Sequence, residues 1–89
     1  MTASKFDIEM WYDEAENKGA TYLIIGLDPF DYDNFPVFVM PHESCRDSVD
    51  KLVAGGNRYD EVYDLKLDRK KQLTEHRAVH IPNDSKVKR

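Results

Sequence analysis

The longest apolar stretch of the chain, residues 21–27, sets the architecture of the fold. It is rich in β-branched side chains, lies between Gly19 and Pro29, and is too short for a stable helix. The sequence therefore predicts a buried central strand here. The rest of the chain must share its hydrophobic core, because 89 residues are too few for a second core.

Two more strands and two helices follow from the remaining pattern. Residues 37–40 lie between prolines and residues 61–67 alternate apolar with polar side chains, so both are predicted strands. Helical spacing of apolar residues predicts a helix over 43–54. A second, surface helix is predicted over 69–79, capped by Asp68.

The N-terminal residues 5–16 fit two interpretations. Their acidic end favours a helix, whereas four apolar side chains alternate as in a strand: Phe6, Ile8, Met10 and Tyr12. We interpret the segment as a strand, which gives the order β-β-β-α-β-α. The expected fold is a single α+β domain over residues 1–82, with a mainly antiparallel sheet and two helices on one face, followed by a polar basic tail at 83–89.

Composition excludes several classes of protein. The single cysteine, Cys45, cannot form an internal disulfide, and no apolar run approaches the roughly 20 residues of a membrane-spanning helix. The N-terminus lacks the apolar centre of a secretory signal. We therefore expect a cytoplasmic protein without membrane contact.

Charge is unevenly distributed along the chain. Residues 1–65 hold 14 acidic and 5 basic side chains, whereas residues 66–89 hold 3 acidic and 8 basic ones. The acidic part is a candidate surface for a basic partner, because summed charge steers association. The same carboxylates would also serve simply to solvate a small domain.

Aromatic rings are mixed with carboxylates in the N-terminal segment and in the loop before residue 37. Exposed rings among acidic groups are typical of a surface that binds a protein with a basic groove. The alternative is that the rings fold back over the core. The predicted partner-binding residues are Trp11, Asp13, Glu14, Asp28, Phe30, Asp31, Tyr32, Asp33 and Phe35.

A metal site is a second hypothesis. The three aspartates of this loop are ligands that Mg²⁺ or Ca²⁺ prefers, although the glycine and glutamate of a calcium loop do not follow. His76 and His80 have the spacing of a zinc pair, with a third ligand to come from His42 or Cys45. We assign no metal, cofactor or catalytic residue, and retain a metal-binding protein or metal-dependent hydrolase as the alternative.

A third hypothesis is a nucleic-acid-binding accessory subunit that uses the basic C-terminal helix. The sequence pI of about 5.3 argues against a dedicated nucleic-acid binder, and the basic segment has no interleaved aromatic residues for base stacking. The basic residues concerned are Lys66, Arg69, Lys70, Lys71 and Arg77, with Lys86, Lys88 and Arg89 of the tail.

Residues 27–39 and 61–68 resemble small acidic accessory proteins encoded by bacteriophages, in which a strand runs into an acidic aromatic loop and a later E-V-Y-D-L segment precedes a polar helix. The resemblance implies a host-takeover or anti-defence role and carries over no catalytic residue. We therefore expect a non-catalytic inhibitor or modulator of a host enzyme or defence complex, bound through a basic surface or groove. A second copy of the chain could also pair through an exposed strand edge.

Overall fold

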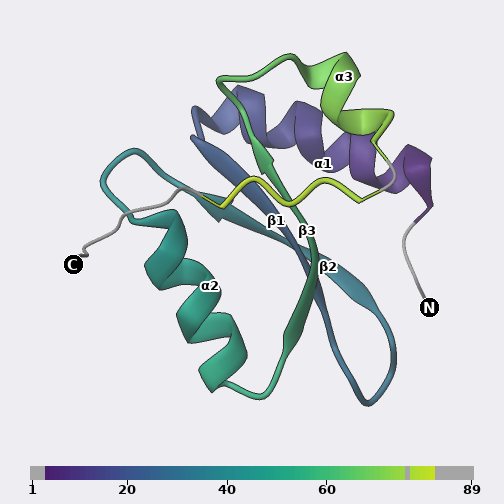
Figure 1. Ribbon diagram of the computed structural model, residues 1–89, viewed down its shortest axis with the longest axis vertical. Coiled ribbons are helices and arrows are strands. Elements are labelled where there is room, and N and C mark those ends of the chain that lie inside the picture. Colours follow the sequence, from purple (N-terminus) through teal and green to yellow (C-terminus); the bar gives the residue numbers. More distant parts are fainter. Residues whose placement is uncertain (1–3, 76, 82–89) are drawn as a thin grey trace.

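The computed structural model describes residues 4–75 and 77–81, and it confirms the α+β class. The order of elements is α-β-β-α-β-α, so the predicted N-terminal strand is wrong (Figure 1). The elements are α1 (Lys5–Lys18), β1 (Tyr22–Leu27), β2 (Asn34–Val39), α2 (Cys45–Ala54), β3 (Arg58–Asp64) and α3 (Arg69–Leu73).

The sheet is antiparallel in the strand order β2-β1-β3, with the predicted apolar strand at its centre. Successive side chains of β1 enter two separate hydrophobic clusters, one on each face of the sheet, so the prediction of a single shared core is wrong. Leu23 and Ile25 pack beneath α1, while Ile24 packs beneath α2 with Cys45 and Val49. The expectation of two helices on one face is therefore wrong. A central strand that is apolar on both faces needs a cover on each of them.

The N-terminal helix forms because both of its ends are strongly specified. The Ser4 hydroxyl accepts a hydrogen bond from the Asp7 N–H, and the Asp7 carboxylate accepts one from the Ser4 N–H. At the other end, Gly19 adopts a left-handed conformation with φ of 78°. Tyr12 and Ala15 are fully buried on the inward face, so helical spacing overrides the alternation of apolar residues.

The C-terminal helix is much shorter than the predicted 69–79 range. It ends at Leu73, and Val79 forms a parallel bridge to Val62 of β3 instead of continuing the helix. Ala78 is fully buried in the core beneath α1, which fixes this extended segment on the sheet. The predicted tail at 83–89 lies outside the described residues.

The outer edge of β3 is closed by groups that follow it in the chain. Its backbone N–H and C=O groups bond to a side-chain amide, to the extended segment 78–80 and to a guanidinium, over 2.7–3.2 Å. The partners are Gln72 for Asp64, Ala78 and His80 for Val62, and Arg77 for Tyr59 and Asp60. Groups that are already paired offer no template for a strand of another chain.

The opposite edge, β2, is interrupted by Pro36. The Asp28 N–H donates to the Asp33 carbonyl and continues the register of the β1–β2 pair. Because bonded and non-bonded pairs alternate, the Ile25–Pro36 pair is non-bonded, so the missing N–H of Pro36 falls on the outer edge. A proline in this position weakens pairing with a second chain.

Candidate functional site

The most exposed aromatic side chain of the described residues, Phe30, lies in the loop that joins β1 to β2, together with the exposed ring of Tyr32. This loop, residues 28–33, is called the tip. Phe30 is 90% exposed and Tyr32 is 63% exposed, so the predicted exposure of these two rings is confirmed. Figure 1 shows the loop at one end of the molecule, well away from α1 and α3.

Backbone hydrogen bonds centred on Asp28 fix the shape of the tip. The Asp28 N–H pairs with the Asp33 carbonyl at 2.9 Å, and the Tyr32 N–H donates to the Asp28 carbonyl at 2.7 Å. The Asp28 carboxylate accepts from the Phe30 N–H at 2.8 Å, as in an Asx turn. The two rings are thus displayed from a defined turn.

The backbone of Tyr32 has a left-handed conformation that residues with a side chain rarely adopt. Its φ is 58°, and it is the only residue other than glycine with a positive φ in the described part of the chain. The left-handed region costs an L-residue with a Cβ roughly 1–2 kcal/mol. Such strain, at an exposed ring that buries little surface, points to a role outside the fold.

The base of the tip is anchored to the neighbouring strand. The Asn34 side-chain amide donates to the Gly26 carbonyl and to the Asp60 carboxylate, each at 2.9 Å. Phe35 is half-buried and lies over Gly26, where an added Cβ would stand 2.5 Å from its ring. Phe35 therefore packs on the sheet, as in the alternative interpretation of the rings, and is not displayed with Phe30 and Tyr32.

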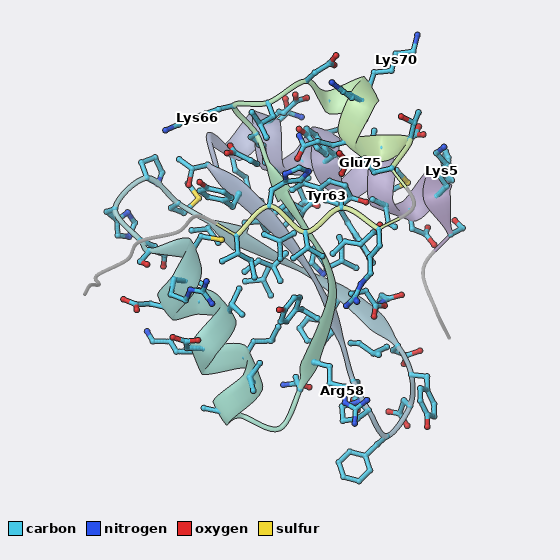
Figure 2. All side chains as sticks on the ribbon, viewed as in Figure 1. Lys5, Arg58, Tyr63, Lys66, Lys70 and Glu75 are labelled. Atoms are coloured by element: carbon cyan, nitrogen blue, oxygen red, sulfur yellow. The ribbon has the colours of Figure 1, made fainter. Side chains whose placement is uncertain are left out.

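The charge around the rings is mainly acidic. Asp31 and Asp33 are exposed, and Asp28 is half-buried and engaged with the Phe30 N–H. Arg58, at the start of β3, lies at the same end of the molecule and adds one positive charge (Figure 2). The tip thus combines three carboxylates, one nearby guanidinium and two projecting rings.

The N-terminal residues of the predicted surface lie on α1 and contact other residues of the same molecule. Trp11 is half-buried against the core beneath α1. Asp13 pairs with Arg69 of α3 at 2.6 Å, and Glu14 approaches Lys18 at 3.7 Å. The predicted residues therefore do not form one continuous surface.

The described residues give little support to the metal hypothesis. They contain no group of three His, Cys, Asp or Glu side chains placed to hold a metal ion. His80 bonds to Glu75 at 2.9 Å, and His76 lies outside the described residues. His42 is exposed, while Cys45 is buried in the core beneath α2.

The basic segment is less available than its sequence indicates. The Arg69 guanidinium bonds to Asp13 and Glu16 and lies 4.8 Å from the centre of the Tyr12 ring. Arg77 donates to backbone carbonyls of β3. Lys66, Lys70 and Lys71 remain exposed, and Figure 2 shows the first two at the α3 end of the molecule.

A buried polar cluster near α3 was not expected from the sequence. The Tyr63 hydroxyl donates to Glu61 at 2.7 Å, and the Gln72 amide, only 2% exposed, donates to the Tyr12 hydroxyl at 3.2 Å. Burial, the hydrogen bond to Glu61 and nearby carboxylates raise the pKa of Tyr63. Tyr63 therefore remains protonated at neutral pH and is a poor base or nucleophile.

A pocket of about 330 Å³ opens beside this cluster. It is called the α3 pocket and is lined by Leu67, Asp68, Lys71, Gln72, Glu75 and His80. No single sequence motif predicts this pocket, because its lining residues come from the β3–α3 turn, from α3 and from the extended segment after α3.

No protein-family model, curated protein or solved structure matches the chain. Within residues 4–75 and 77–81, every helix is too short or too polar to cross a bilayer.

Proposed function

We propose that this chain is a non-catalytic protein-binding module that docks through the tip. The observation that carries the proposal is the near-complete exposure of Phe30, with Tyr32 also exposed beside it. Burying one such ring in a partner stabilises a complex by about 1.5–3 kcal/mol. Because the ring sits on a turn fixed by hydrogen bonds, little conformational entropy is lost on docking.

The chemistry of the tip indicates the kind of partner. A projecting ring fits a concave apolar pocket, and Asp31 and Asp33 fit basic residues around that pocket. The resemblance to small acidic bacteriophage accessory proteins favours a host enzyme or defence complex as the partner. In this proposal, the chain inhibits or modulates that protein by occupying its basic surface.

Photo-crosslinking from the tip tests the proposal. One full-length variant carries benzoylphenylalanine at position 30, and a control variant carries it at position 53 of α2, where Val53 is 52% exposed. The proposal predicts that the position-30 probe crosslinks a host protein that the position-53 probe does not. Adding Asp31→Asn and Asp33→Asn should reduce that crosslink. Identical products from both positions, or no product specific to position 30, would argue against the proposal.

A further inference from the structure

The α3 pocket has the composition of a site for a small molecule. Its volume of about 330 Å³ lies within the usual range of ligand pockets, ~300–1,000 Å³. Leu67, which is 48% exposed, contributes apolar surface to the lining. Gln72, only 2% exposed, contributes an amide that is fixed by hydrogen bonds to Tyr12 and Asp64. Apolar surface with a few positioned polar groups is typical of a ligand site.

The charged side chains of the lining favour a ligand with a net positive charge. Asp68 and Glu75 contribute two carboxylates, and Lys71 contributes one ammonium group. Lys66 and Lys70 lie outside the lining and are exposed, so water solvates their ammonium groups. With a neutral His80 ring, the lining carries one more negative than positive charge. A ligand with two cationic groups and one carboxylate would match these charges group by group.

Both carboxylates of the lining are held in position by bonds within the chain. The Asp68 carboxylate accepts from the Lys70 N–H at 3.1 Å through Oδ1, and the Glu75 carboxylate bonds to the His80 ring at 2.9 Å through Oε1. An ionised carboxylate has two oxygens and about four acceptor positions. These bonds therefore orient the two carboxylates and leave acceptor capacity for a bound cation.

Tyr63 gives independent evidence of a negative potential beside the pocket. Its pKa is raised first by burial, then by the hydrogen bond to Glu61 and the charge of Glu61, and then by the charge of Glu75. Figure 2 shows Tyr63 and Glu75 in the same part of the molecule, next to α3. The potential that helps to keep the proton on Tyr63 also attracts a cationic ligand.

We propose that the α3 pocket binds a basic amino acid of the arginine type, with its two cationic groups facing Asp68 and Glu75 and its carboxylate facing Lys71. A guanidinium group suits this lining because it is planar, offers five N–H donors and is more weakly hydrated than an ammonium group. It therefore loses less hydration on contact with Leu67. The site is separate from the tip and does not depend on the function proposed for the tip.

NMR titrations of the wild-type chain with arginine, citrulline and agmatine test the proposal. Citrulline has nearly the shape of arginine without the guanidinium charge, and agmatine is arginine without the carboxylate. The reporter is the side-chain amide of Gln72, which belongs to the lining. Arginine should shift the Gln72 signals to saturation. Citrulline should bind at least about tenfold more weakly, because it lacks charge-assisted hydrogen bonds.

Three variants assign the charged groups of the pocket. Glu75→Gln keeps the size of the side chain and should weaken arginine binding about tenfold. Asp50→Asn, at an exposed position of α2, removes one carboxylate elsewhere and should leave arginine binding unchanged. Lys71→Ala should weaken the binding of arginine but not that of agmatine, which has no carboxylate for Lys71 to meet.

Three results would overturn the inference: no saturating shift with arginine, equal binding of arginine and citrulline, or equal effects of Glu75→Gln and Asp50→Asn. The first two use the wild-type chain, so they do not depend on the folding of a variant. An equal effect of Lys71→Ala on arginine and agmatine would overturn the orientation proposed for the ligand. All of these chains keep Phe30, so the crosslinking test of the tip succeeds or fails separately.

Discussion

Tyr32 and Tyr63 show how residues of one type serve different roles in this molecule. Tyr63 is 2% exposed, and its hydroxyl donates a hydrogen bond to Glu61. Its ring packs edge-on against the Tyr12 ring, with the two ring centroids 5.8 Å apart. Tyr32 is exposed and strained, and its ring contributes little to the core. We infer that Tyr63 contributes to stability, and we propose that Tyr32 contributes to binding.

Replacing Tyr32 should therefore leave stability unchanged or raise it. Asparagine tolerates the left-handed region better than tyrosine, so Tyr32→Asn should raise the free energy of unfolding by up to about 1 kcal/mol. Urea denaturation of both proteins measures the difference. A clear loss of stability would mean that the Tyr32 ring packs against the fold.

The raised pKa of Tyr63 predicts a loss of stability at alkaline pH. Its folded pKa lies above the unfolded value near 10, so the native state keeps a proton that the unfolded state releases. The stabilisation is fully present below pH 10 and falls as the pH rises further, by up to about 1.4 kcal/mol per pH unit. Burial also raises the pKa of Tyr12, which adds to the same slope.

Urea denaturation between pH 8 and pH 11 measures this dependence. Tyr63→Phe should make the decline above pH 10 shallower, while Tyr12 maintains part of it. An unchanged slope in the variant would show that Tyr63 does not titrate with unfolding.

At the level of elements, the sequence predicts the strands and helices whose formation depends on local patterns of residues. The central strand and α2 form where expected, because a buried apolar run and a helical spacing of apolar residues are strong local signals. The sequence also contains the residues that cap α1, Ser4 with Asp7 at its start and Gly19 at its end, and these favour a helix over a strand. The burial of Tyr12 and Ala15 on one face of α1 shows that these two signals outweigh the strand-like alternation of apolar residues.

The C-terminal region could not be predicted in this way, because distant contacts decide it. Arg69 binds acidic groups of α1, and Gln72 bonds to both Tyr12 and Asp64. The segment after α3 is extended because Ala78 fills the core and its backbone completes the edge of β3. For the candidate site, the exposed rings were predictable, whereas the inward role of Phe35 required the register with Gly26.

Gln72 should be the residue of α3 that contributes most to stability. Gln72→Ala removes the partner of the Asp64 N–H and of the Tyr12 hydroxyl, at a cost of about 1–3 kcal/mol, while the Asp64 carbonyl still accepts from the Leu67 N–H. Lys71→Ala, at the exposed neighbouring position, is the matched control and should change stability by less than about 0.5 kcal/mol. Equal effects of the two variants in thermal or urea unfolding would contradict this role.

At the level of the whole molecule, a small sheet covered on both faces supports one exposed aromatic loop. The β3 edge is closed by the chain itself and the β2 edge is interrupted, so the scaffold resists strand pairing while the tip remains accessible. Acidic groups at the tip should speed association with a basic partner, and the Phe30 ring should slow dissociation. These two contributions can be separated kinetically.

The most direct measurement is the pair of rate constants for binding to the protein crosslinked from position 30. Phe30→Ala should raise the dissociation rate about 10- to 100-fold with little change in association. Asp31→Asn with Asp33→Asn should mainly lower the association rate and flatten its dependence on salt. Unchanged rates for both sets of variants would contradict docking through the tip.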